Sequence, residues 1–185
     1  MNLKDLKIDR TWTLFLDRDG VINRRIVDDY VKSWDQFEFL PGVMEAARMF
    51  STLFGRIIVV SNQQGVGKGL MTGIQVQAIH DRMTDEIRAA GGRVDAVYFS
   101  PHLHKDSSLM RKPNVGMALM ARRQFPDLRF NRSLMAGDSL SDMIFGKRAG
   151  MKTVFISADP AAARSNPRQI DYLCPDLITL AHALK

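Results

Sequence analysis

Two aspartates, Asp17 and Asp19, stand one residue apart at the end of the apolar run WTLFL and just before Gly20. Carboxylates crowded in this way can bind a cation, attack an electrophile or transfer a proton. Taken alone, the segment DRDG fits an ordinary Asp-Gly turn or the DxD motif with which sugar-nucleotide transferases bind a metal. An EF-hand calcium loop is excluded, because Val21 and Ile22 stand where that loop needs an oxygen ligand and a glycine.

Polar groups also follow three later apolar runs. The second run ends in Ser61, Asn62 and Gln63, the third leads through a loop to Arg111 and Lys112, and the fourth ends in Asp138 and Ser139, with Asp142 one helical turn later. The glycine-rich SNQQGVGKG is not a phosphate loop, because Asn62 and Gly69 stand where that pattern needs Gly and Ser or Thr. Each group has an ordinary reading as a turn or a helix cap, but that reading does not explain why four successive runs end in this way.

These groups meet only if the apolar runs are neighbouring strands of one sheet. The runs are short and rich in β-branched or aromatic residues, as is typical of strands buried on both faces: WTLFL (12–16), RIIVV (56–60), VDAVYF (94–99), RSLMAG (132–137) and MKTVFI (151–156). Segments with apolar residues at helical spacing alternate with them. This alternation predicts an α/β fold, a three-layer Rossmann-like parallel sheet with helices on both faces. Ligands of such sheets bind at the carboxyl ends of the strands.

The segment 23–40, NRRIVDDYVKSWDQFEFL, interrupts the alternation. Its pieces YV and FEF predict an extended hairpin or flap, inserted after the first strand and lying over the carboxyl edge of the sheet. The chain after Ser157 offers a short strand at DYLC and a terminal helix from Pro175. Neither the flap nor the loop 100–112 is long enough for a cap domain, so we expect a single domain over residues 1–185 without a large cap.

Composition restricts the classes of function. No apolar run approaches the roughly 18 residues that span a membrane, and the charged N-terminus MNLKDLKIDR lacks a signal-peptide core, so we expect a cytoplasmic protein with no membrane partner. The net charge of +6 is scattered and aromatic residues are 8%, which favours a small anionic metabolite over nucleic acid. Cys174 is the one cysteine, which excludes an internal disulfide. We expect a monomer.

The collected groups match the needs of phosphomonoester hydrolysis. A phosphate brings negative charge toward carboxylates, so the site needs a cation, and Mg²⁺ bound by Asp17 and Asp138 is the natural choice. One carboxylate can attack phosphorus, and a second can protonate the leaving alkoxide and later activate water. A lysine and a hydroxyl can hold the phosphoryl oxygens.

This ordered set resembles the motifs of the haloacid dehalogenase-like phosphatases over nearly the whole chain. DRDGVIN is similar to their first motif, SN after the second strand to their second, the lysine of RKP to their third and GDSLSD to their fourth. The resemblance implies that Asp17 is the nucleophile. It also implies that Asp19 is the general acid and base and a Mg²⁺ ligand through its carbonyl oxygen.

The same resemblance implies roles for the residues of the later motifs. Ser61 and Lys112 would clamp the phosphoryl group, Asp138 would be the metal carboxylate, and Asp142 would support it. The match is closer still to one branch, because FLDRDGVIN, YVKSWDQFEFLPGV, SNQQGVGKG, RKPNVGM and GDSLSDM look like segments of the D-glycero-D-manno-heptose-1,7-bisphosphate 7-phosphatases. That likeness implies removal of the 7-phosphate from this heptose bisphosphate, in the synthesis of nucleotide-heptoses.

One departure from the branch concerns a zinc loop. The family usually carries Cys-x-His after the third strand and a cysteine pair before RKP, whereas Ser100 stands at the first position here and no cysteine precedes Arg111. His102 and His104 remain, but two histidines without thiolates make a poor structural zinc site. We therefore expect Mg²⁺ and no zinc.

The resemblance also implies substrate contacts. The family's arginine before the lysine contacts substrate beyond the transferred phosphate, so Arg111 is expected to bind the second phosphate of a sugar bisphosphate, beside Lys112. The further expected contacts are Arg18, Asn23, Tyr30, Asn62, Gln63 and Ser139. For Arg18 a surface salt bridge that points away from the substrate is the alternative.

Other functions stay open at this point. The substrate could be histidinol phosphate or another sugar phosphate, and a polynucleotide 3′-phosphatase shares the motifs but would need a basic, aromatic-lined groove. From other classes, a metal-dependent glycosyl or nucleotidyl transferase could use DRD as its DxD, which leaves Lys112 and Asp142 without a role. A catalytically inactive phosphosugar-binding module is disfavoured, because nucleophile, acid, lysine and metal carboxylate are all present.

Overall fold

One parallel sheet organises the chain. The computed structural model describes residues 3–159 and 161–185, and within them six strands pair in the order β3-β2-β1-β4-β5-β6. The strands are β1 (Thr13–Leu16), β2 (Arg56–Asn62), β3 (Ala96–Ser100), β4 (Ser133–Gly137), β5 (Lys152–Ile156) and β6 (Tyr172–Cys174). The chain builds outward from β1 to β3 and then crosses back to β4 beside β1. This reversal creates a switch point between the carboxyl ends of β1 and β4, where such sheets bind ligands.

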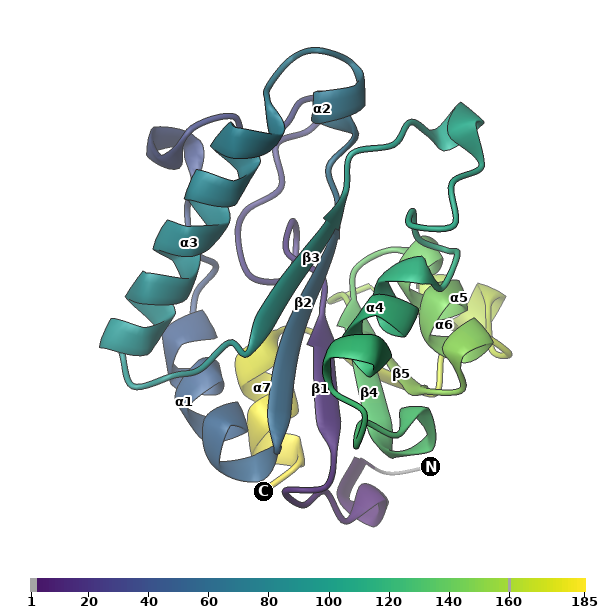
Figure 1. Cartoon of the computed structure of the whole chain (residues 1–185). Helices are drawn as coiled ribbons and strands as arrows, with labels where there is room; N and C mark the ends of the chain where they lie inside the picture. Colours follow the sequence, from purple (N-terminus) through teal and green to yellow (C-terminus); the bar gives the residue numbers. More distant parts are fainter. Residues whose placement is uncertain (1–2, 160) are drawn as a thin grey trace.

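Helices cover both faces of this sheet, as the sequence predicts (Figure 1). One face carries α1 (Val43–Leu53), α3 (Gly73–Ala89) and α7 (Leu177–Ala183), and the other carries α4 (Gly116–Gln124) and α5 (Leu140–Ala149). Two shorter helices are α2 (Gln64–Gly67) and α6 (Ala161–Ser165), and single 3-10 turns occupy Leu3–Leu6, Trp34–Gln36, His104–Asp106 and Phe130–Arg132. In the described part of the chain, no helix is both long and apolar enough to cross a membrane.

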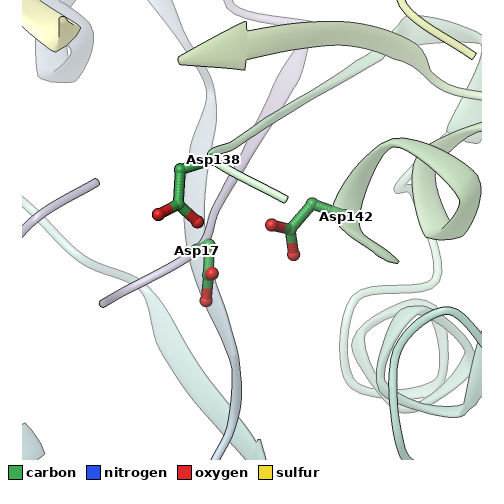
Figure 2. Close-up of side chains that lie close together, drawn as sticks. All are labelled: Asp17, Asp138 and Asp142. Carbon is green, nitrogen blue, oxygen red and sulfur yellow. The ribbon is translucent and has the colours of Figure 1, made fainter. Parts of the chain in front are cut away.

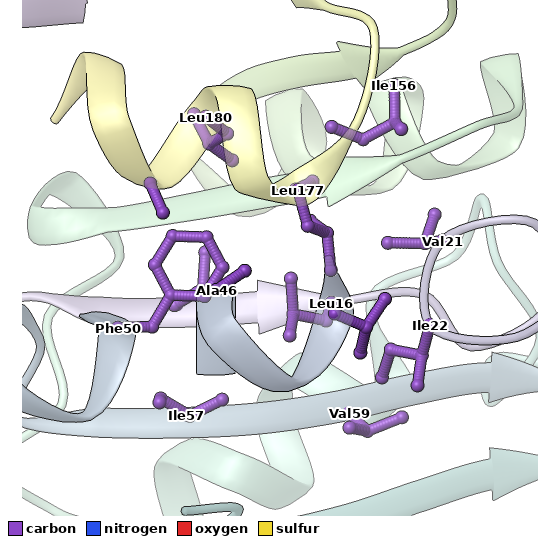
Figure 3. Packing of buried hydrophobic residues seen from close by; sticks show 14 of the residues in the cluster. Leu16, Val21, Ile22, Ala46, Phe50, Ile57, Val59, Ile156, Leu177 and Leu180 are labelled. Carbon is purple, nitrogen blue, oxygen red and sulfur yellow. The ribbon is translucent and has the colours of Figure 1, made fainter. Parts of the chain in front are cut away.

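The core forms on both sides of the sheet because successive strand side chains point to opposite faces. In β1, Leu14 and Leu16 belong to one apolar cluster and Phe15 belongs to the other. The first cluster contains Phe50 of α1 and Leu180 of α7, two helices that pack beside each other on the same face of the sheet (Figure 3). Burial on both faces explains why the strands read as continuous apolar runs.

The segment 23–40 forms a flap, and the structure resolves which of the two expected forms it takes. Its arms meet at an isolated antiparallel bridge between Asn23 and Phe39, so no regular hairpin ladder forms. The returning arm is instead held by aromatic rings, with Trp34 and Phe37 stacked nearly parallel at 4.7 Å between centroids and with Phe39 edge-on to both. The flap is therefore an irregular loop whose returning arm packs through these rings.

The packing at Phe50 yields a stability prediction. Phe50 is fully buried and packs edge-on against Phe54, with ring centroids 5.9 Å apart. Phe50→Ala leaves a cavity between α1 and the sheet, so we expect the free energy of unfolding to fall by about 3–5 kcal/mol. Chemical denaturation measures this loss. Ile74→Ala is the control, because Ile74 is 83% exposed on α3 and its truncation should leave the unfolding midpoint nearly unchanged; equal losses in the two variants would contradict the described core.

Candidate active site

The carboxyl edge gathers side chains that lie far apart in the sequence. Asp17 directly follows β1, and its backbone N–H still donates to the carbonyl of Ala136 in β4, at 3.0 Å. Asp138 directly follows β4, and Asp142 lies in the first turn of α5. Figure 2 shows the three carboxylates turned toward one another. The switch point of the sheet is therefore lined by acid groups.

These three carboxylates form a potential metal site. One oxygen of each carboxylate lies within 4.8 Å of one oxygen of each of the other two. Among the described residues, this is the group of His, Cys, Asp or Glu side chains placed closely enough to hold a metal ion. Burial, together with the negative charge of Asp142, raises the pKa of Asp17 to about 7. Burial likewise raises the pKa of Asp138 to about 6, although Arg25 opposes the shift. The cluster thus carries more negative charge than its surroundings neutralise, and a divalent cation would relieve it.

Two glycines allow the carboxylates to approach. Gly20 has a φ of +88°, and a Cβ there would collide with the Asp138 carboxylate. A Cβ on Gly137 would collide in the same way with the side chain of Asp142. Only glycine therefore lets the backbone pass this close to the acid groups.

Lys112 is the buried cation that faces the acid cluster. Its side chain is 1% exposed, and its Nζ lies 2.8 Å from Asp17 Oδ1, 2.5 Å from Asp142 Oδ1 and 2.7 Å from the carbonyl oxygen of Val60. Burial opposes the charged ammonium, but Asp142 and Asp17 outweigh it and raise the pKa of Lys112. Two carboxylates and one carbonyl oxygen thus surround the ammonium group. Asn62 fixes the backbone of Lys112, donating to its carbonyl and accepting from its N–H, each at 3.0 Å.

Asp19 is held by donors on several sides. Arg18 donates to both of its carboxylate oxygens at 2.7 and 2.9 Å, Asn23 donates to Oδ1 at 3.0 Å, and Gln63 donates to Oδ2 at 2.7 Å. Burial by itself raises the pKa of Asp19, but the charge of Arg18 and these hydrogen bonds outweigh it and hold the pKa below its ordinary value. Asp17 and Asp19 therefore have opposite electrostatic environments, although they are two residues apart.

Arg18 corrects one sequence expectation. The alternative expectation for this residue, a surface salt bridge, is wrong, because Arg18 is fully buried. Its side chain also does not line the cleft. Its guanidinium lies behind Asp19, 6.0 Å from the ring centre of Phe37 and with Nη1 3.1 Å from His80 Nε2. Burial and the neighbouring Arg18 lower the pKa of His80 to about 3, so its Nε2 accepts the arginine proton. Sequence reasoning missed His80; the one available signal was its position among the inward-facing residues of α3.

Asn23 and Gln63 are also buried, and the structure does not place them in the cleft lining, so their direct contact with substrate stays a prediction. They are hydrogen-bonded to Asp19, and Gln63 also donates to Ser61 Oγ at 2.7 Å. Their side chains complete the polar shell around Asp19. In the structure both side chains orient catalytic candidates.

Arg25, on the flap, is a second residue that sequence reasoning missed. Its Nη2 donates to Asp138 Oδ1 at 2.8 Å and to the backbone carbonyl of Asp19 at 3.2 Å. These are two of the oxygens that the sequence predicts as metal ligands. A cationic group thus lies where their oxygens converge, which supports the fit of a cation to this donor set. The position of Arg25 in a flap expected to overhang the edge was the one signal in the sequence.

A cleft of about 440 Å³ opens over these groups. Of the predicted site residues, its lining includes Asp17, Asp19, Tyr30, Ser61, Asn62, Arg111, Lys112 and Ser139. The residues that it adds are Arg25, Asp28, Asp29, Gln64, Lys68 and Ser141, together with the flap residues Ile26 and Val31. Lys68 Nζ lies 5.2 Å from the ring centre of Tyr30, which ties the flap to α2. The cleft therefore carries Arg25, Lys68 and Arg111 together with the flap carboxylates of Asp28 and Asp29 above the acid groups at the strand ends.

The loop after β3 is ordered by its own hydrogen bonds. Asp106 accepts from the backbone N–H of Leu103 at 2.8 Å, and Asn114 donates to the carbonyl of Ser108 at 3.1 Å. Arg111 donates to the carbonyl of His102 at 3.1 Å, which holds its guanidinium at the cleft. These contacts give the loop an ordering mechanism made of side-chain and backbone groups.

Comparison with known proteins gives consistent matches. The family model described as "HAD-hyrolase-like" matches residues 109–180. A D-glycero-alpha-D-manno-heptose-1,7-bisphosphate 7-phosphatase from Mycobacterium bovis is 44% identical over 132 residues, 71% of this chain and 70% of that protein. A D-glycero-beta-D-manno-heptose-1,7-bisphosphate 7-phosphatase from Pasteurella multocida is 30% identical over 93% of this chain and 96% of its own.

The solved structures agree with the sequence matches. The D,D-heptose 1.7-bisphosphate phosphatase from B. bronchiseptica, complexed with magnesium and phosphate, has a TM-score of 0.83 at 30% identity. The match covers 94% of this chain and 97% of that one. The likeness thus extends over both the sheet and the loops at its carboxyl edge.

The raised pKa of Asp17 predicts a pH dependence of stability without added metal. Below its ordinary value of 3.8 the carboxyl is neutral in both states, and as pH rises toward about 7 the folded state resists ionisation while the unfolded state does not. The contribution of Asp17 to stability is therefore lost over this window. Asp17→Asn removes the titration, so its melting temperature relative to the natural protein should rise between about pH 5 and pH 7.5.

Thermal unfolding in chelator-treated buffer measures this difference. Asp28→Asn is the matched control, since Asp28 is exposed on the flap and water solvates its charge in both states. A difference for Asp17→Asn that stays constant across the pH range would contradict the electrostatic description of the cluster.

Proposed function

This chain belongs to the haloacid dehalogenase-like phosphatases, in the branch of the D-glycero-D-manno-heptose-1,7-bisphosphate 7-phosphatases, and we propose that it hydrolyses the 7-phosphate of this heptose bisphosphate. The observation that carries the proposal is the meeting of Asp17, Asp19 and Lys112 at one cleft. A nucleophile, a proton donor and a phosphate-binding cation are the groups that phosphoryl transfer through an enzyme carboxylate requires. The metal-dependent transferase is less well supported, because it needs neither Lys112 nor its pairing with Asp142.

Mg²⁺ fits the donor set. Oxygens of Asp17 and Asp138 and the carbonyl of Asp19 would hold it, with Asp142 supporting the cluster through Lys112 and through its cap of α5. When bound, the ion neutralises the carboxylates and lets an anionic phosphate approach them. Arg25 must then leave Asp138 and is free to face the substrate. We propose no zinc, because the loop after β3 offers His102 and His104 without thiolates.

The catalytic cycle follows from the side chains themselves. Asp17 attacks phosphorus and forms an aspartyl-phosphate, while Ser61 and Lys112 bind the phosphoryl oxygens. Lys112 already contacts three oxygens, so we expect a phosphoryl oxygen to take the place of one of them. Asp19 donates a proton to the leaving alkoxide and then takes one from the attacking water.

The pKa of Asp19 matters differently in the two halves of this cycle, the formation and the hydrolysis of the aspartyl-phosphate. Its lowered pKa suits the second half, in which a carboxylate accepts a proton from water. For the first half Asp19 must hold a proton, so substrate binding has to loosen its pairing with Arg18. His80 and Phe37 keep Arg18 in place behind Asp19 during both halves.

The second phosphate has basic partners on the cleft wall. Arg111 and Lys68 both line the cleft, on the loop after β3 and beside α2, and neither has a carboxylate partner in the structure's described residues. A guanidinium binds a phosphate through two parallel hydrogen bonds. This supports a substrate with a second anionic group over a monophosphate.

Removal of the nucleophile tests the chemistry. Asp17→Asn should lower phosphate release from heptose bisphosphate and from an aryl phosphate by a factor on the order of 10³ or more, because the amide cannot form the phospho-enzyme. Phosphate release with Mg²⁺ measures this. Asp28→Asn makes the same change on the flap of the same cleft and should keep most of the activity. Full activity in Asp17→Asn would exclude the covalent route.

Replacement of Arg111 tests the substrate. Arg111→Gln should raise the KM for heptose 1,7-bisphosphate roughly tenfold or more, the expected loss of a charged hydrogen-bonded pair, while leaving aryl phosphate hydrolysis unchanged. Lys105→Gln, an exposed change on the same loop, is the control. Phosphate release by the natural protein is also compared across a panel of substrates: both anomers of heptose 1,7-bisphosphate, hexose bisphosphates, histidinol phosphate and a 3′-phosphorylated oligonucleotide. A preference for either of the last two would replace the heptose assignment.

A further inference from the structure

A second cavity, of about 380 Å³, lies at the amino edge of the sheet. Three segments line it: residues 10–13 before and into β1, Gly55 and Arg56 at the start of β2, and residues of the loop 127–132 before β4. The parallel strands run away from this edge toward the catalytic cleft, and in Figure 1 the edge lies at the bottom. The two cavities share no lining residue.

The lining of this cavity is strongly basic. It contains Arg10, Arg56, Arg129 and Arg132 against one acidic residue, Asp127, so four positive charges minus one negative charge leave a net +3. Such a cavity attracts anions from solution.

Contacts to the protein fix three of the guanidinium groups while leaving most of their donors free. Arg10 Nη1 donates to the carbonyl of Ser51 at 2.8 Å, and Arg132 Nη1 donates to Thr11 Oγ1 at 2.7 Å. The third, Arg56, pairs with Asp127 at 2.6 Å and lies 4.5 Å from the ring centre of Phe125. Each guanidinium has five N–H donors, so unused donors remain on all three.

Arg129 differs from the other three. Its side chain is exposed in the cavity lining, and the structure gives it no hydrogen-bond or ion-pair partner among residues 3–159 and 161–185. It contributes charge without an evident role in the fold. Arg129 is therefore the residue whose replacement separates ligand binding from stability.

We propose that this cavity binds a diphosphate group, supplied either by inorganic pyrophosphate or by a nucleoside diphosphate. Its volume lies within the range of small-molecule sites, about 300–1,000 Å³, and planar guanidinium groups match phosphoryl oxygens in pairs. Two linked phosphates carry enough charge to balance the net +3 of the lining and to displace Asp127 from Arg56. Trp12 lines the cavity but packs against the core, so the arginines are the groups that would bind the phosphates. The inference does not depend on the activity proposed for the opposite edge.

Calorimetry with inorganic pyrophosphate in Mg²⁺-free buffer at low ionic strength tests the proposal. One pyrophosphate should bind per chain, and Arg129→Gln should weaken it roughly tenfold, the effect of losing charged hydrogen bonds. Two matched arginine-to-glutamine changes should leave the affinity unchanged: Arg164→Gln, exposed on α6, and Arg111→Gln in the catalytic cleft. In a Trp34→Phe background Trp12 is the single tryptophan, so its emission should report binding at this cavity.

Three outcomes would overturn the site: no saturable binding, equal affinity in Arg129→Gln, or loss of binding in Arg111→Gln. The last would assign pyrophosphate to the catalytic cleft. ADP forms the second arm. Tighter binding of ADP than of pyrophosphate, with the same sensitivity to Arg129→Gln, identifies a nucleoside diphosphate as the source, and weaker binding identifies free pyrophosphate.

Discussion

The contact between Lys112 and two buried aspartates is the interaction on which the carboxyl edge depends. Three carboxylates are brought together at the end of β1 and at the start of α5, in a region from which water is largely excluded. Without Lys112, Asp17 and Asp142 would be buried charges lacking a partner, a state that strongly destabilises proteins. Burial raises the pKa values of Asp17 and Asp138, and the charge of Asp142 adds to the shift, although Lys112 and, for Asp138, Arg25 oppose it. A divalent cation would therefore stabilise this site, and so would a reaction that converts the Asp17 carboxylate into a covalent intermediate.

The second consequence of burial is that Asp17 and Asp19 have different electrostatic environments. Asp17 faces other carboxylates and has a raised pKa, whereas Asp19 faces Arg18, Asn23 and Gln63 and has a lowered one. Pairs of acid groups with divergent environments are how enzymes give similar side chains different roles. The Arg18–His80 contact maintains this difference from behind the site, because neutral His80 accepts from the guanidinium and leaves its charge to Asp19.

The two edges of the sheet differ in charge for a geometric reason. Parallel strands present all their carboxyl ends on one side and all their amino ends on the other, so residues that follow strands and residues that precede them collect separately. Acidic residues follow β1 and β4, whereas arginines precede β1 and β4 and begin β2. The overall charge of +6 hides this division, which appears only when the strands are assembled.

The sequence by itself determined the fold class and part of the cleft. Apolar strand runs in alternation with helical spacing predict the sheet; Asp17, Ser61 and Asp138 directly follow such runs, and Lys112 stands in the motif RKP. What the tertiary structure decided was the direction of each side chain and its distant partners. Arg18 turns inward to His80, and Arg25 reaches Asp138 113 positions along the chain. The positions of strand ends follow from local periodicity, whereas these contacts depend on how the flap and α3 pack against the sheet, which no local pattern specifies.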